Sequence, residues 1–131
     1  MLHTAGRDFV CGALGDASGS RPAAAQYIAL TANNTSPSAG DTTLTGEITT
    51  AGGGLVRAVG TYAHTTGAAT YTLTKTFTGN GSDSYPVTVN KVAVLNASSS
   101  GTMVYSSLLS PSATFSASGD NTTITVTVTV S

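Results

Sequence analysis

Threonine occupies every second position from residue 123 to residue 129, and isoleucine or valine fills the positions between. This period of two matches a β-strand, in which successive side chains point to opposite faces of a sheet. Both sets of side chains are β-branched, which favours an extended backbone. We therefore predict a terminal strand with one buried apolar face and one exposed hydroxyl face. A similar alternation over residues 71–78 predicts a second strand of this kind.

Turn-forming residues divide the rest of the chain into short extended segments. Clusters of Gly, Asn, Asp and Ser recur about every eight to twelve residues, the spacing typical of β-sandwich domains. Near Asn90 and Lys91 the apolar phase of one segment shifts, which predicts a β-bulge. Pro111 is expected to break the extended chain. We expect the terminal strand to be preceded by strands over residues 25–31, 55–64, 68–78, 85–96, 102–109 and 113–117.

These segments predict an all-β fold. The favoured architecture is an antiparallel β-sandwich of about seven strands, immunoglobulin-like or similar, and a small barrel is the alternative. We expect residues 25–131 to form the sandwich. Residues 1–24 are expected to form an N-terminal arm, in which residues 5–14 can make a short helix that Gly12 weakens. The arm either orders against a partner or caps the sandwich's own core, and the residues alone leave both readings open.

The composition argues against two classes of partner. Charged residues make up only 8% of the chain, far below the roughly 25% of ordinary soluble proteins. A net charge of −1 gives no long-range field to attract nucleic acid or an anionic membrane. No stretch approaches the roughly 18 apolar residues of a transmembrane helix, and the first residues lack the pattern of a signal peptide. We therefore expect no nucleic acid and no membrane as partners.

The residues that usually carry catalysis or bind metals are few and scattered. His3 and His64 are the two histidines, and neither has a Cys, His or carboxylate partner at metal-ligand spacing. The six acidic residues stand singly, whereas glycosidase chemistry needs two converging carboxylates. Cys11 is alone and cannot form an internal disulfide. We therefore expect no catalytic residue, no metal site and no cofactor, and an enzyme such as a wall hydrolase is the least favoured alternative.

Four charged residues suggest local roles. Lys75 and Lys91 fall on the apolar phase of their strands, where a lysine either protects a sheet edge against aggregation or makes a salt link to a partner subunit. Glu47 and Arg57 flank a glycine run and can pair locally. If exposed, such a pair would contribute only about 0–1 kcal/mol. The segment 79–83 is interpreted as a turn rather than a calcium loop, because it lacks the spaced acids.

Short motifs spread over most of the chain form a further pattern. They are AGRD (5–8), YIALT (27–31), DTTLTGEI (41–48), RA (57–58), GTY (60–62), YTLTKTF (71–77), LNAS (95–98), GTMV (101–104) and SGD (118–120) with the threonine-rich strand after it. Together these motifs resemble those of small virion structural proteins of tailed bacteriophages. The resemblance brings no catalytic residues with it.

The resemblance implies a non-enzymatic virion component, assembled in the bacterial host cytoplasm. Its role would be that of a capsid decoration (cement) protein that binds and stabilises the head surface. The alternative is a tail or head-fibre module that contributes to host-surface attachment through polar loops such as 79–84 and 97–101. The implied partners are the major capsid protein or other virion proteins, and a homo-oligomer is compatible with either role.

In the decoration reading, the N-terminal arm is the segment expected to order against the shell. Phe9, Val10 and Leu14 would be its apolar anchors, and Arg7 and Asp8 its polar contacts. A weakly apolar arm adds buried area at an interface. Many copies on one lattice then strengthen the whole through avidity.

Overall fold

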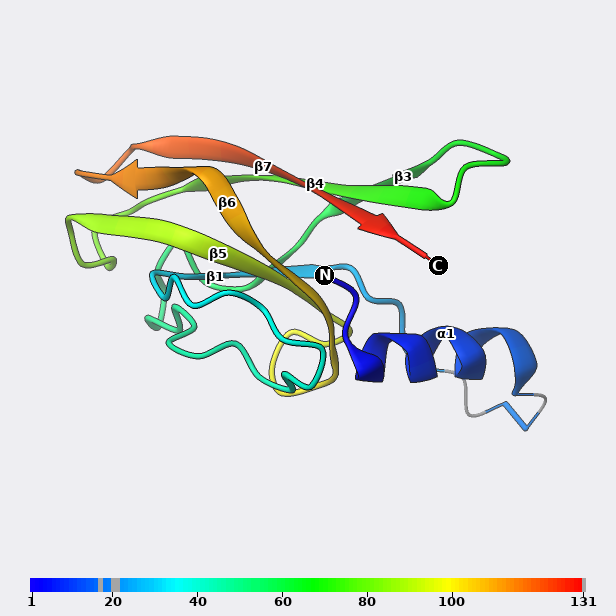
Figure 1. Ribbon diagram of the computed structural model, residues 1–131. Helices are drawn as coiled ribbons and strands as arrows, with labels where there is room; N and C mark the ends of the chain where they lie inside the picture. Colours follow the sequence, from blue (N-terminus) through cyan, green and yellow to red (C-terminus); the bar gives the residue numbers. More distant parts are fainter. Residues whose placement is uncertain (17, 20–21, 131) are drawn as a thin grey trace.

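The computed structural model describes residues 1–16, 18–19 and 22–130, which form two antiparallel sheets and one helix (Figure 1). The helix α1 spans Thr4–Gly15, close to the short helix predicted within the arm. The strands that follow are β1 (Tyr27–Thr31), β2 (Ala58–Val59), β3 (Thr61–His64), β4 (Thr70–Thr78), β5 (Val87–Leu95), β6 (Met103–Phe115) and β7 (Asn121–Thr129).

The strands pair in two separate sheets. One sheet has the order β2-β1-β5-β6, and the other has the order β3-β4-β7. Every pairing is antiparallel. Figure 1 shows β4 and β7 in one layer and β1 and β5 in the layer facing it. The predicted all-β antiparallel sandwich of about seven strands is therefore confirmed, and the sheets do not close into the barrel that was the alternative.

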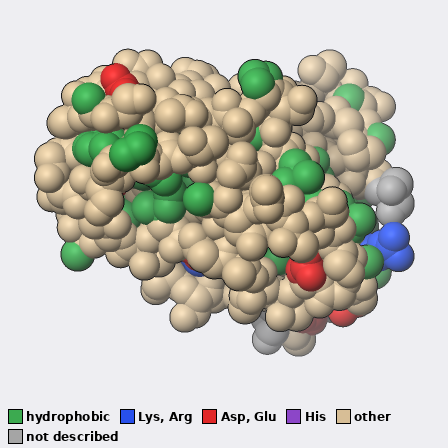
Figure 2. Space-filling view, turned by 60° about the vertical axis from the view of Figure 1, so that its left-hand side comes forward, with side chains coloured by type: hydrophobic (Ala, Val, Ile, Leu, Met, Phe, Trp, Pro, Cys, Tyr) green, Lys and Arg blue, Asp and Glu red, His purple; other side chains and the backbone are tan. Residues whose placement is uncertain are grey.

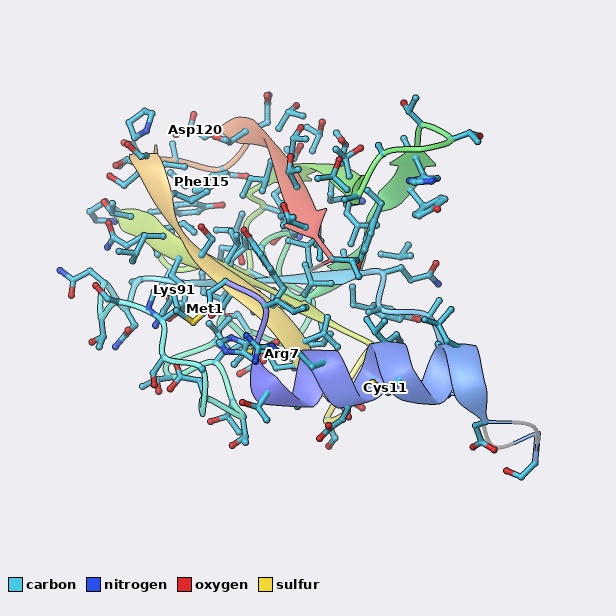
Figure 3. All side chains as sticks on the ribbon, turned by 45° about the vertical axis from the view of Figure 1, so that its right-hand side comes forward. Met1, Arg7, Cys11, Lys91, Phe115 and Asp120 are labelled. Atoms are coloured by element: carbon cyan, nitrogen blue, oxygen red, sulfur yellow. The ribbon has the colours of Figure 1, made fainter. Side chains whose placement is uncertain are left out.

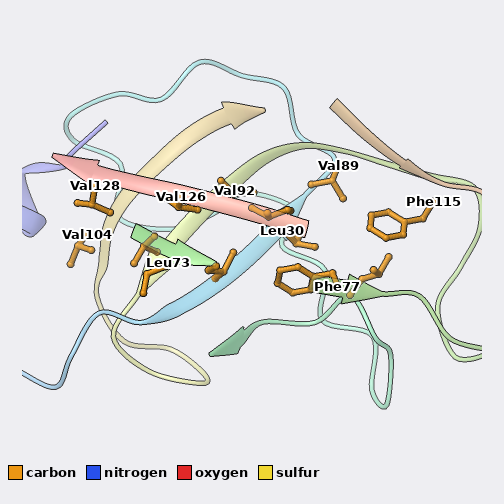
Figure 4. Packing of buried hydrophobic residues seen from close by; sticks show 13 residues of the cluster. Leu30, Leu73, Phe77, Val89, Val92, Val104, Phe115, Val126 and Val128 are labelled. Atoms are coloured by element: carbon orange, nitrogen blue, oxygen red, sulfur yellow. The ribbon is translucent and has the colours of Figure 1, made fainter. Parts of the chain in front are cut away.

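The apolar faces of the two sheets form the core (Figure 4). In β7, Ile124, Val126 and Val128 are at most 4% exposed, while the threonines at the odd positions are exposed. This confirms the buried face and the hydroxyl face that the alternation predicts. Two large rings, Phe77 of β4 and Phe115 of β6, are also buried in this cluster.

The strand predicted over residues 55–64 is wrong in two respects: residues 55–57 do not form a strand, and the chain changes sheets within the remainder. β2 pairs with β1 in the first sheet, and β3 pairs with β4 in the second. The crossing point is Gly60, where an added Cβ would lie 3.0 Å from Ile28 Cδ1 and 3.3 Å from Leu73 Cβ. A glycine allows the backbone to pass this close to the core.

The break predicted at Pro111 is also wrong. The segments expected at 102–109 and 113–117 are joined in the single strand β6, which runs through Pro111. Its pairing with β5 passes from Leu108 to Ala113 across an irregularity between Val89 and Lys91. That irregularity confirms the bulge predicted near Asn90 and Lys91. Because Pro111 lies outside the paired positions, the sheet does not need the N–H group that proline lacks.

Candidate interaction surfaces

The first three residues are attached to the outer edge of β6. Leu2 forms an antiparallel bridge with Tyr105. The backbone N–H of His3 donates to the carbonyl of Val104 at 2.9 Å, and the N–H of Ser106 donates to the carbonyl of Met1 at 3.1 Å. These bonds fix the point from which α1 starts.

The buried side chain of His3 stabilises this attachment through two hydrogen bonds. His3 is 0% exposed, with Nδ1 2.9 Å from the carbonyl oxygen of Ser38 and Nε2 2.8 Å from Oγ of Ser106. A carbonyl only accepts, so Nδ1 carries the hydrogen and Nε2 accepts from the Ser106 hydroxyl. Burial, the largest cause, lowers the pKa of His3, while the Ser38 carbonyl and the Asp41 carboxylate act in the opposite direction. The imidazole is therefore neutral at pH 7.

The first half of α1 packs against the sandwich. An added Cβ at Gly6 would lie only 2.4 Å from the carbonyl oxygen of Val104, so the first turn of the helix touches the β6 backbone. Phe9 is half-buried and packs against the main core cluster. Residues 1–9 thus cap the domain's own core, as one of the two readings of the arm requires.

The outer side of α1 remains exposed. Arg7 and Leu14 lie two turns apart on one side of the helix, and Leu14 is 81% exposed. Asp8 is exposed and Val10 is half-buried. Figure 3 shows α1 extending beyond the sheets, with Arg7 at its attached end and Cys11 further out. The structure therefore separates the five predicted contact residues: it turns Phe9 inward and leaves Arg7, Asp8 and Leu14 on the surface.

A second candidate surface is formed by two adjoining hollows that share residues 47–50. One, of about 400 Å³, is lined by Leu55, Asp83 and Ser84. The other, of about 460 Å³, is lined by Arg57 and residues 98–100. The two loops that the fibre reading singles out, 79–84 and 97–101, thus meet the same segment of chain.

Arg57 and Glu47 pair as the sequence suggested, and the pair is largely buried, so the small contribution expected of an exposed pair does not apply to it. Their side chains are 9% and 14% exposed, respectively. Arg57 donates from Nε to Glu47 Oε2 at 2.8 Å and from Nη2 to Oε1 at 2.6 Å. Its Nη1 donates to the carbonyls of Ala97 and Ser100 at 3.0 and 2.8 Å. The pair therefore ties the loop after β5 to the segment that lines both hollows.

The two lysines on apolar phases lie in central strands. Lys91 belongs to β5 and Lys75 to β4, and each strand has a neighbour on both sides, so the interpretation as edge protection is wrong. Lys91 is 5% exposed, and its Nζ donates to the carbonyl of Thr35 at 2.8 Å. A lysine buried on the loop-covered face of the first sheet thus anchors the loop after β1.

Asp83 organises the loop 79–84. It is 9% exposed, and its Oδ2 accepts from the backbone N–H groups of Gly54 and Asn80, both at 2.9 Å. The segment is thus a hydrogen-bonded turn, as interpreted from the sequence. Within residues 1–16, 18–19 and 22–130, no three His, Cys, Asp or Glu side chains come together in a group that could hold a metal ion.

Two further findings bear on function. Within the described residues, no helix is both long enough and apolar enough to cross a membrane. No protein-family model, curated protein or solved structure matches the chain.

Proposed function

We propose that this chain is a non-enzymatic bacteriophage virion structural protein that decorates the capsid and stabilises the head surface. The observation that carries the proposal is the position of α1. The helix is fixed to β6 at its first turn, and its second half projects with Leu14 81% exposed. A helix that projects from the sheets can insert an apolar side chain into a pocket of another protein, and the centres of protein interfaces are apolar.

The remaining surface supports the same role. Charged residues make up 8% of the chain, and Figure 2 shows a face with few charged side chains and separate apolar patches. Low charge allows copies to sit close together on a lattice, because their mutual repulsion is weak. A single helix gains little binding energy alone, but many copies on one shell gain avidity. On this proposal the partner is the major capsid protein or another virion protein, as the resemblance of the motifs implies.

A tail or head-fibre module is the second candidate. The observation that favours it is the pair of hollows sharing residues 47–50, because they join the loops 79–84 and 97–101 on a braced frame. Their lining is rich in hydroxyl groups, which can exchange hydrogen bonds with surface glycans. A fibre would use this surface, whereas a decoration protein would use α1.

The copy number in purified particles of the encoding phage separates the two roles. A decoration protein is expected at a copy number of the same order as the major capsid protein, measured by quantitative mass spectrometry. A copy number far below that of the capsid protein would favour the fibre. Absence of the chain from the particles would contradict both.

A substitution on α1 tests the contact itself. Leu14→Asp should abolish cosedimentation with shells that lack this chain, while its melting temperature stays unchanged because the residue is exposed. The matched control is Val59→Asp, which places the same charge on an apolar residue of β2 that is 49% exposed. Equal binding of both variants would contradict the role of α1. This substitution is cleaner than deleting residues 1–14, because deletion would also remove the buried His3.

A further inference from the structure

The two sheets have four outer edges, and three of them are guarded against pairing with another chain. The edge strand β2 has two residues and β3 has four. Residues 1–3 cover β6 at positions 104–106, and Pro111 interrupts the rest of that edge. Short strands, prolines and covering segments are the usual means by which proteins prevent edge-to-edge association.

The fourth edge, formed by β7, carries none of these protections. The strand has nine residues and is paired with β4 alone, in a register without irregularity from Asn121 to Thr129. Residues 121–130 contain no charged residue and no proline. A long, regular and uncharged edge is the kind that accepts a further strand.

The hydrogen bonds at the two ends of β7 show which backbone groups are free. The N–H of Val130 donates to Ala69, and the N–H of Gly79 donates to Asp120, both at 2.9 Å. In an antiparallel ladder the bonded positions alternate, so the even-numbered residues of β7 bond to β4. The odd-numbered residues then direct their N–H and C=O groups away from the sheet. These are the residues whose threonine side chains lie on the exposed face.

We propose that β7 pairs in an antiparallel manner with β7 of a second copy, joining two three-stranded sheets into one continuous sheet. Pairing through the free groups places odd residues opposite odd residues. Threonine then lies opposite threonine on the exposed face, and isoleucine or valine lies opposite its own kind on the core face. The edge is self-complementary, as a twofold contact between identical chains requires.

The side chains and charges of the edge favour a second copy over an unrelated strand. Threonines already hydrogen-bond across β4 and β7, where Oγ1 of Thr76 lies 2.7 Å from Oγ1 of Thr123. The same contact can repeat across the new pair. Asp120 precedes the strand, so antiparallel pairing keeps the two carboxylates at opposite ends. Because each copy offers one unguarded edge among the described strands, assembly stops at two.

Pairing of β7 requires no property of a virion, so it is independent of the proposed function. An interface made of one strand pair is smaller than a standard protein interface, so the dimer should be weak and depend on concentration. We expect the mass-average molecular weight to rise from that of the monomer towards that of the dimer between about 10 μM and about 1 mM, by sedimentation equilibrium.

Two variants of one residue test the backbone of this edge. Thr127→Pro removes a free N–H group, and proline is tolerated in an edge strand where that group faces solvent. We expect it to stay monomeric at least tenfold above the concentration at which the wild type dimerises. Thr127→Val keeps the N–H group and should dimerise like the wild type. A dimer that persists in Thr127→Pro, or a wild type that stays monomeric at about 1 mM, would overturn the proposal.

Hydrogen exchange of the wild type decides the question even if Thr127→Pro fails to fold. The amides of Val126 and Val128 bond to β4 and should be protected at every concentration. The amides of Thr125 and Thr127 should become protected only at concentrations where the dimer forms. Dimerisation without added protection of these two amides would place the interface elsewhere and refute the pairing of β7.

Discussion

Arg57 donates two parallel hydrogen bonds to the Glu47 carboxylate, from Nε and Nη2. Its other terminal nitrogen, Nη1, donates to the carbonyls of Ala97 and Ser100. One guanidinium therefore connects Glu47, ten residues earlier in the chain, to a loop that lies 40 to 43 residues later. A planar fork of donors is required for this geometry, and lysine cannot provide it. The contact joins the segment 47–57 to the loop between β5 and β6.

Arg57→Lys is therefore expected to destabilise the fold. The variant keeps the positive charge but loses the planar fork, so an ammonium group cannot remake all the hydrogen bonds to Glu47, Ala97 and Ser100, and we expect a loss of about 1–3 kcal/mol. Urea unfolding followed by circular dichroism measures the change. The control is Arg7→Lys on the exposed side of α1, which should change stability by less than about 0.5 kcal/mol. Equal stability of the two variants would show that the pair contributes little.

His3 should make stability depend on pH. Burial lowers its pKa below the ordinary 6.5, so the unfolded chain takes up the proton more readily than the folded one. The stabilisation is present in full above about pH 6.5 and is lost as the pH falls towards the lowered pKa. The charged groups that act on the imidazole are Asp41, which opposes the shift, and Lys91 and the amino group of Met1, which add to it.

Thermal unfolding between pH 8 and pH 5 measures this dependence. We expect the melting temperature of the wild type to fall below pH 6.5, and His64→Asn to behave in the same way because His64 is exposed. His3→Gln should be less stable at pH 8 and should lose this part of the slope. An unchanged slope in His3→Gln would assign the pH dependence to other groups.

Local patterns predicted much of the fold, and contacts between distant residues account for what was missed. The alternation in β4 and β7 is visible in the sequence because it depends only on neighbouring residues. The division of the strand at Gly60 depends on Ile28 and Leu73, which close around it only after both sheets have formed. Proline usually ends a β-strand because it lacks the N–H group that the sheet needs. Pro111 can stay within β6 because the pairing with β5 is irregular near residue 90 and leaves Pro111 unpaired.

In the candidate surfaces, too, some features are visible in the local sequence and others depend on contacts between distant residues. The burial of His3 could not be predicted from the sequence, because its hydrogen-bond partners Ser38 and Ser106 lie 35 and 103 positions away. The separation of Phe9 from Leu14 was readable from the sequence, however. Five residues on an α-helix correspond to a rotation of about 140° between side chains, so the two could not share one face.

Gly54 has no room for a side chain. An added Cβ would lie 1.9 Å from the carbonyl oxygen of Thr78, at the end of a central strand. Gly54→Ala should therefore destabilise the fold by at least about 2 kcal/mol, because backbone must move to relieve the overlap. Gly81→Ala is the matched control, since nothing lies within 4 Å of its Cβ position. Chemical unfolding should separate the two variants, and a wild-type midpoint for Gly54→Ala would contradict the packing of this loop.

Val126→Asp tests the orientation of β7 directly. Val126 is 4% exposed and belongs to the main core cluster, so the variant buries a carboxylate without a partner. Such a charge costs several kcal/mol, which is a large part of the stability of a small domain. We expect the protein to lose its cooperative thermal transition. Thr125→Asp is the neighbouring control, because its side chain lies on the exposed face and should leave the transition in place. If Thr125→Asp unfolded the protein and Val126→Asp did not, the buried and exposed faces of the strand would be reversed.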